Sequence, residues 1–302
     1  MVFVRKVTSK GKKYWILVYS IRRGKKIVQK TRYLGKTLPP KTRLEQIKKS
    51  FLQEVAARKS RFFSQDDIEA IEKKKEGYTE ELRKLSSFEK KERMKEFTIR
   101  FTYDSSKLSG LDITLRQTYL ILKQGIIPQG FKDLRTTKEL ENHEKGIIAI
   151  TRFKGKLDLS FMRRLHKILF TGVDDALAGK FRFELQKDVK IAGTAYVPPK
   201  WHQLKKELRI FFLWYSSDGK KLHPLELASL VHLKLISLQP FPDGNSRLSR
   251  LIMNWILWKK KYPLVHIPVE DLEEYYNVLD QYQIEKNERP FIEYIKKRYL
   301  NS

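Results

Sequence analysis

The stretch SLQPFPDGNSRLSRLIMN, Ser237 to Asn254, joins two apolar segments through a short polar loop. Apolar residues at helical spacing predict helices over residues 223–238 and 246–260. The first helix should stop at Pro240, because proline disfavours helical backbone in the residue before it. The Gly-Asn-Ser link before the second helix then presents free backbone N–H groups at a helix start. Such a position binds anions.

The side chains of this loop fit a phosphorylated ligand. Arg247 and Arg250 are three residues apart, so both should project from one helix face and suit phosphate oxygens. Asp243 is a hard oxygen ligand for Mg²⁺ that bridges phosphates. Helix capping and surface ion pairs are the alternative explanation for the same residue types. We predict phosphate contacts at Gly244, Asn245, Ser246, Arg247 and Arg250, and a metal ligand at Asp243.

The charge of the chain favours a polyanionic partner. Among 302 residues there are 63 Lys+Arg and 35 Asp+Glu, a net charge of +28. Residues 1–60 hold 18 of the basic and only 2 of the acidic residues. A basic sheet with interleaved aromatic rings is typical of contact with nucleic acid. The alternative is that the rings form a small core while the lysines are solvated.

Composition also excludes several classes of site. The chain has no cysteine, which excludes disulfides, zinc–thiolate sites and a cysteine nucleophile. The first residues lack a secretory signal pattern, and no apolar run approaches the length of a membrane span. We therefore expect a cytoplasmic protein without membrane contact. Its oligomeric state stays open.

Three segments are expected along the chain. Residues 1–37 predict a basic β-meander, and residues 38–96 a charged helical linker with a break near Gly77. Residues 97–302 predict a mainly helical domain. Its expected helices are 114–124, 136–152, 158–170, 200–215, 223–238, 246–260, 270–282 and 289–299. Alternation in VKIAGTAYVPP predicts a hairpin or extended flap that includes Ile191, Ala192, Gly193, Thr194 and Tyr196.

The loop sequence QPFPDGNSRLSR resembles the signature of the Fic (Fido) family, His-Pro-Phe-x-Asp/Glu-Gly-Asn-Gly/Lys-Arg-x-x-Arg. HPLELASLVHLKLISLQPF resembles the family's preceding helix. AGKFR, KIAGTAYVPP and YPLVHIPVEDLEEYYNVLD resemble the stretch before the flap, the flap, and the segment after the signature. The likeness covers roughly residues 97–300. It implies a mainly helical Fic-type domain with a β-hairpin flap.

The resemblance also implies a reaction, the transfer of AMP from Mg-ATP to a Ser, Thr or Tyr hydroxyl of a target protein. The target would pair with the flap as an added strand. Gln239 stands in place of the family's histidine base, and an amide does not titrate near neutral pH. His202 and His232 are candidate substitute bases. A weakened adenylyltransferase and a non-catalytic nucleotide-binding regulator both stay open.

A second departure concerns regulation. The long class of the family carries an inhibitory motif, Ser/Thr-x-x-x-Glu-Gly/Asn, whose glutamate pairs with the second signature arginine. The matching residues here run from Ser105 to Gly110, and Ser109 occupies the glutamate position. We therefore expect Arg250 to lack a competitor and the nucleotide site to be open.

Overall fold

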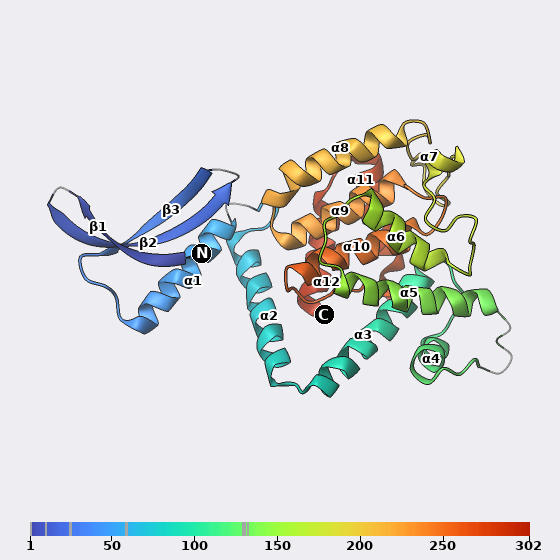
Figure 1. Ribbon diagram of the computed structural model, residues 1–302, viewed down its shortest axis with the longest axis horizontal. Coiled ribbons are helices and arrows are strands. Elements are labelled where there is room, and N and C mark those ends of the chain that lie inside the picture. Colours follow the sequence, from blue (N-terminus) through green and yellow to red (C-terminus); the bar gives the residue numbers. More distant parts are fainter. Residues whose placement is uncertain (1, 10, 24–25, 58–59, 129–130, 132) are drawn as a thin grey trace. The chain divides into compact units, whose positions relative to one another are not determined.

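The computed structural model describes residues 2–9, 11–23, 26–57, 60–128, 131 and 133–302. Contacts divide the chain into two compact units, Met1–Ala70 and Ile71–Ser302. Figure 1 shows a small sheet with one helix in the first unit and a large helical assembly in the second. The expected segments 1–37, 38–96 and 97–302 stay a prediction.

The first unit is built on the expected β-meander. Strands β1 (Val2–Ser9), β2 (Lys12–Arg23) and β3 (Lys26–Gly35) pair antiparallel in the order β1-β2-β3. Helix α1 (Lys41–Ala57) brings Phe51 against Leu17 of β2, and both side chains are buried. α1 therefore packs on the sheet through its apolar stripe.

The aromatic rings of this sheet do not form its core as a group. Tyr19 packs against the buried cluster of Leu17 and Phe51. Tyr33 is 62% exposed, and its ring lies 5.6 Å from that of Tyr14. The alternative of an aromatic core with solvated lysines thus holds for Tyr19 and not for Tyr33.

All regular secondary structure among the described residues of the second unit is helical. It contains α2 (Gln65–Lys84, from Ile71 on), α3 (Ser87–Lys107), α4 (Leu115–Tyr119), η1 (Leu120–Gln124), α5 (Leu134–Arg152), α6 (Leu159–Phe170), α7 (Arg182–Leu185), α8 (Leu204–Ser217), η2 (Gly219–Lys221), α9 (Pro224–Leu238), α10 (Asn245–Lys259), η3 (Val269–Asp271), α11 (Leu272–Glu285) and α12 (Arg289–Asn301). The eight helices expected in this region are confirmed with small shifts at their ends.

Helices α9 and α10 form the centre of this unit, and α5, α6, α8, α11 and α12 surround them (Figure 1). Nearly every residue of α10 is buried, including Trp255 at 1% exposure. α5 approaches α10 at Gly146, where an added Cβ would lie 2.9 Å from Leu251. The loop between α9 and α10 is therefore held by two rigid, buried helices.

The break expected near Gly77 is wrong. α2 continues through Gly77, and the chain turns instead at Leu85 and Ser86. Ser86 caps α3 in a reciprocal capping box with Glu89. A glycine inside a helix costs only about 1 kcal/mol, whereas the capping box satisfies two backbone groups at a defined helix start.

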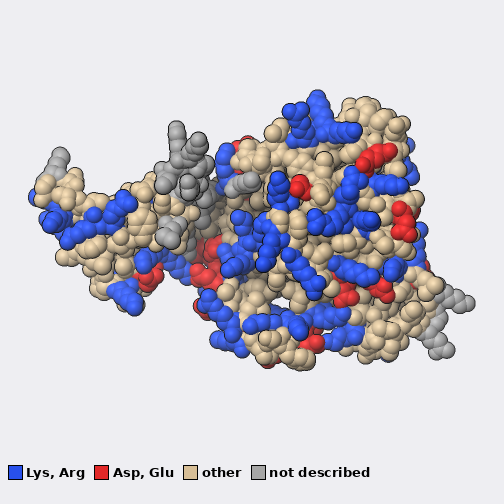
Figure 2. Space-filling model, in the orientation of Figure 1, with Lys and Arg blue, Asp and Glu red and all other residues tan. Residues whose placement is uncertain are grey.

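Two further features bear on function. No helix among the described residues is long and apolar enough to cross a membrane. Figure 2 shows lysine and arginine side chains over much of the visible face of the helical unit as well as on the first unit. Positive charge is therefore densest in sequence near the N-terminus without being confined there.

Candidate functional site

The loop between α9 and α10 depends on two residues in the left-handed backbone region. Gln239 ends α9 with φ 47°, and Gly244 precedes α10 with φ 72°. A Cβ on Gly244 would lie 2.3 Å from Cε2 of Phe170, so the position requires glycine. No side chain caps α10. The first N–H groups of α10 are therefore available to an anion.

Asn245 closes the loop on itself. Its Oδ1 accepts from the backbone N–H of Phe241 at 2.9 Å, and its Nδ2 donates to the carbonyl of Phe241 at 2.8 Å. Nδ2 also donates to Oε1 of Gln239 at 2.7 Å. The side chain of Asn245 thus shapes the loop.

Gln239 is fixed at both ends of its amide. Nε2 donates to the carbonyl of Ile236 at 2.7 Å, while Oε1 accepts from Asn245. The side chain is partly buried. Gln239 is therefore a structural amide of this loop, and it cannot accept a proton near neutral pH.

His166 of α6 packs against the loop and supports it. Gly179 donates its N–H to Nδ1 at 2.9 Å, so Nδ1 is unprotonated and Nε2 carries the hydrogen. Nε2 then donates to the carbonyl of Asp243 at 3.1 Å. The ring stacks between Phe241, at 3.9 Å, and Phe170, at 4.4 Å. Burial lowers the pKa of His166 to about 4, so the imidazole is neutral.

Arg182 at the start of α7 ties the loop to the flap. Its fully buried guanidinium donates to the carbonyls of Leu238 at 3.0 Å and Gln239 at 2.5 Å. The same side chain reaches Pro199 at 2.9 Å and Lys187 at 3.5 Å, the two ends of the flap. One buried arginine therefore fixes both flap ends beside the end of α9.

The flap is extended but forms no hairpin. Residues 187–199 are all described, none belongs to a strand, and the chain turns at Ala192 and Gly193. Thr194 Oγ1 donates to Asp280 of α11 at 2.6 Å, and Tyr196 donates its hydroxyl to the carbonyl of Ser237 at 3.1 Å. Side chains, not a ladder of backbone bonds, hold this segment.

The remaining flap residues point outward or lie near the turn. Ile191 is partly buried, and Ala195 and Val197 are exposed, Val197 by 66%. The alternation expected in sequence is thus present, with Thr194 and Tyr196 docked and their neighbours facing solvent.

Asp243 is exposed at the mouth of the loop. Its Oδ1 accepts the N–H of Gly244 at 2.6 Å, and no contact of Oδ2 is recorded among the described residues. The described part of the chain contains no group of three or more metal-ligating side chains. Mg²⁺ bound through nucleotide phosphates and water needs only one or two protein carboxylates. Asp243 fits that role.

Arg247 lies against α5. Its Nη1 forms a buried ion pair with Glu139, and its guanidinium lies 5.5 Å from the ring centre of Phe170. Its Nε is buried and has no hydrogen-bond partner in the part of the chain that is described.

Burial and the charges of Arg250 and Arg247 lower the pKa of His143, so both arginines lie near that ring. Their partners differ, because Arg250 contacts Ser105 of α3. That the two arginines share one helix face stays a prediction.

Arg250 belongs to α10, and its fully buried side chain lies beside the C-terminal end of α3. Nε and Nη2 donate to the hydroxyl and the carbonyl of Ser105 at 2.9 and 2.7 Å, and Nη2 also reaches the hydroxyl of Ser109 at 2.8 Å. Nη1 lies 3.4 Å from the hydroxyl of Ser246. All of these acceptors are neutral, and burial lowers the pKa of Arg250.

This arrangement corrects one expectation. Arg250 was expected to face an open site, yet the segment from Ser105 to Gly110 occupies its guanidinium. Gly110, with φ 86°, follows Ser109 at the turn that ends α3. The motif segment therefore engages Arg250 without supplying a carboxylate.

The two other histidines considered as bases lie in unlike places. His202 is exposed in the turn before α8. His232 is fully buried in α9, its Nε2 lies 3.0 Å from the hydroxyl of Tyr275, and burial lowers its pKa to about 3. Burial excludes His232 from contact with a protein substrate.

Sequence reasoning missed the roles of His166 and Arg182. Both act through backbone atoms far along the chain, namely Asp243 and the two flap ends. The one signal in sequence was the AGKFR stretch around Arg182, which marked a region and not a contact.

Comparisons with known proteins agree on this domain. A profile of the Fic/DOC family matches residues 156–257. The protein adenylyltransferase Fic of Drosophila grimshawi is 33% identical over 205 residues, which cover 67% of this chain and 41% of that protein. The Drosophila melanogaster protein of the same name is 32% identical over 67% of this chain and 40% of its own length. This chain thus spans about two fifths of these relatives.

Solved structures share the fold. A Fic domain containing signaling protein from Bacteroides thetaiotaomicron superposes with a TM-score of 0.68 at 26% identity, covering 78% of this chain and 94% of that one. Fic-1 from C. elegans gives a TM-score of 0.66 at 21% identity over 87% and 75% of the two chains.

Proposed function

The chain contains a Fic/DOC family domain, and from this premise we propose that it binds a Mg-nucleotide, ATP in the first place, at the loop before α10. Its nominal reaction is transfer of AMP to a Ser, Thr or Tyr hydroxyl of a target protein. The hydroxyl oxygen attacks the α-phosphorus, the bond to pyrophosphate breaks so that pyrophosphate leaves, and the hydroxyl proton passes to solvent water.

Each described group has a part in binding. The N–H groups of Asn245 and Ser246 and the positive end of the α10 dipole hold phosphate. Asp243 would hold Mg²⁺, which would neutralise phosphate charge. Arg250, whose acceptors are neutral, exchanges them for phosphate oxygens.

One observation carries the further proposal that transfer is weak. The amide of Gln239 is held by Ile236 and Asn245 and provides no base. Loss of a general base costs about 10²–10⁴-fold in rate. Positioning and charge stabilisation at the phosphates do not depend on that base.

The test is intact-protein mass spectrometry after incubation with Mg-ATP, with wild type beside Gln239→His. We expect an AMP adduct on Gln239→His and little on wild type. The double variant Gln239→His with Asp243→Asn should lose the adduct, because its metal ligand is gone. Equal labelling of wild type would show that Gln239 does not limit transfer. Absence of both labelling and calorimetric ATP binding would overturn the proposal.

The second candidate is a non-catalytic nucleotide-binding regulator. The locked amide of Gln239 favours it, because both of its polar atoms already have partners in the loop. Wild type that binds Mg-ATP by calorimetry, but modifies no protein in a lysate where Gln239→His does, would select this candidate.

A target protein is proposed to bind along the flap. Ala195 and Val197 face solvent while Thr194 and Tyr196 anchor the segment. Extended backbone fixed in this way is suited to strand addition by a partner.

Nucleic-acid contact through residues 1–60 is a separate proposal. The exposed pair Lys12→Ala and Lys13→Ala should lower the slope of log K against log salt by roughly 2, because each phosphate contact contributes about 0.9. Fluorescence anisotropy with duplex DNA and RNA measures the slope. The matched pair Lys154→Ala and Lys156→Ala, exposed on the helical unit, should leave it unchanged. A protein that ignores both duplexes at low salt would end the proposal.

A further inference from the structure

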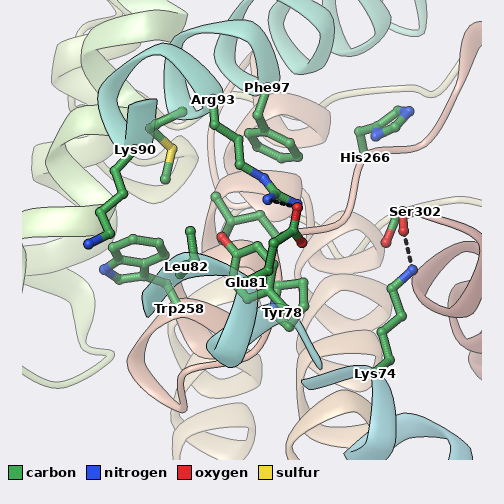
Figure 3. A pocket seen from close by; sticks show the side chains of 13 residues that line it. Lys74, Tyr78, Glu81, Leu82, Lys90, Arg93, Phe97, Trp258, His266 and Ser302 are labelled. Carbon is green, nitrogen blue, oxygen red and sulfur yellow. Dashed lines mark hydrogen bonds and ion pairs between the residues drawn. The ribbon is translucent and has the colours of Figure 1, made fainter. Parts of the chain in front are cut away.

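A cavity lies in the helical unit, apart from the loop and the flap. It has a volume of about 540 Å³ and is enclosed by α2, α3, the end of α10 and the segment that follows it (Figure 3). None of its lining residues belongs to the Gln239–Arg250 loop or to the flap. The volume lies in the range of about 300–1,000 Å³ that small-molecule sites occupy.

The body of the cavity is apolar and rich in rings. Tyr78 comes from α2, Phe97 from α3 and Trp258 from α10, and Leu82, Met94, Pro263 and Leu264 complete the wall. Trp258 donates its indole N–H to the carbonyl of Thr151 at 2.9 Å, which fixes the ring. Three rings on three helices suit a flat ring system, because aromatic pairs add specific contact energy to area burial.

The rim of the cavity carries more positive than negative side chains. Lys74, Lys90 and Arg93 line it together with one acidic side chain, Glu81. Arg93 pairs with Glu81 at 2.5 Å, and Lys74 donates to the backbone oxygen of Leu300 at 3.0 Å.

Lys90 differs from the other two cations. Within the described part of the chain the Lys90 ammonium group has no ion pair or hydrogen bond, and the side chain is exposed. Figure 3 shows it extending along the same side of the cavity as Trp258. One cation is thus left at the mouth of a cavity lined by rings.

From this combination we propose that the cavity binds a small aromatic anion. The rings of the ligand pack on Tyr78, Phe97 and Trp258, and its carboxylate, sulfonate or phosphate group meets Lys90. Binding here is independent of the nucleotide loop.

The test uses two matched probes with the full chain. 1-Anilinonaphthalene-8-sulfonate carries a sulfonate, and N-phenyl-1-naphthylamine has the same rings without it. We expect saturable binding of the sulfonate at one site, with energy transfer from tryptophan, and at least about fivefold weaker binding of the neutral probe.

Variants locate the site. Met94→Trp fills the cavity and should abolish binding, whereas Lys90→Glu should weaken the sulfonate about tenfold or more and leave the neutral probe unchanged. Lys91→Glu, on the neighbouring exposed position of α3, should change neither. Lys90 is exposed, so its substitution tests the proposal even if Met94→Trp does not fold.

Two results would overturn the proposal. Sulfonate binding that survives Met94→Trp in a folded protein, or no binding at all, would show that the cavity is not the site. Equal affinity for the two probes, together with no effect of Lys90→Glu, would show an apolar site that does not select anions.

Discussion

At the residue scale, Gln239 and Ser109 set the contacts of two polar groups of the site. The amide of Gln239 accepts a hydrogen bond from Asn245 and cannot take up a proton near neutral pH. Ser109 gives Arg250 a neutral acceptor at 2.8 Å. Hydrogen bonds from a charged donor to a neutral acceptor are weaker than those to an ionised one. The phosphate of the proposed nucleotide would therefore compete for Arg250 with a weaker partner than a glutamate.

The change Ser109→Glu tests this argument. A glutamate at this position should pair with Arg250 and weaken Mg-ATP binding by about 1.5–3 kcal/mol, the range for a hydrogen bond to a charged group. Isothermal titration calorimetry measures the affinity.

Ser109→Ala is the matched control. It removes the hydroxyl acceptor without adding charge, so ATP affinity should stay within about threefold of wild type, less than 1 kcal/mol. If Ser109→Glu binds ATP as well as Ser109→Ala does, Arg250 does not contact the nucleotide.

At the element scale, the loop is fixed by backbone conformation and by the packing of α6 under it. Position 244 requires glycine for two reasons, because its φ is positive and because Phe170 fills the space that a Cβ would need. The flap is extended and pairs with no strand. Alternation predicts extended backbone, but a strand also needs a neighbouring strand. Of the two forms that the alternation left open, a hairpin or an extended flap, the segment adopts the extended one.

Gly244→Ala should lower the free energy of unfolding by about 2–5 kcal/mol. About 1–2 kcal/mol comes from the left-handed backbone, and about 1–3 kcal/mol from overpacking against Phe170. Urea unfolding followed by circular dichroism measures the difference.

Gly193→Ala separates the two causes. Its φ is 79°, and an added Cβ meets nothing within 4 Å, so only the backbone cost applies. Equal losses for Gly244→Ala and Gly193→Ala would show that Phe170 moves aside freely.

At the scale of the whole molecule, the helical unit buries three neutral histidines. Burial lowers the pKa of His166 to about 4 and that of His232 to about 3, and it lowers the pKa of His143 well below its usual value. Unfolded histidines take up protons near pH 6.5. Stability should therefore fall as pH drops below about 6.5, and the loss from His166 should level off below about 4.

The size of this effect can be measured between pH 7 and pH 5. Each buried histidine should reduce the free energy of unfolding by about 2 kcal/mol over that interval. Burial raises the pKa of the Glu72 carboxyl, but hydrogen bonds from His223 and Tyr262 and the charge of Lys75 lower it to about 2. The contribution of this carboxylate to the free energy of unfolding is therefore lost only below about pH 4.5.

Variants assign the slope. His166→Asn should reduce the loss in free energy of unfolding between pH 7 and pH 5 by about 2 kcal/mol, the contribution of one buried histidine. His202→Asn, at an exposed position, should not change that loss. An unchanged slope in His166→Asn would mean that its imidazole is protonated in the folded protein.

The sequence by itself determined the helices, the end of α9 before Pro240 and the lack of a titrating group at Gln239. Helical spacing, Pro240 and the capping residues act over a few positions, so their effects are readable from neighbours along the chain. The inability of Gln239 to act as a base is a property of the side chain and needs no structure.

Only the tertiary structure decided what each polar group of the site contacts. Arg247 meets Glu139, 108 positions earlier, and Arg250 meets Ser105, 145 positions earlier. His166 and Arg182 support the loop and the flap through hydrogen bonds to backbone atoms. The cavity lined by Tyr78, Phe97 and Trp258 exists only because α2, α3 and α10 meet there. Such contacts depend on how buried helices pack against one another. That packing cannot be deduced from the pattern of neighbouring residues along the chain.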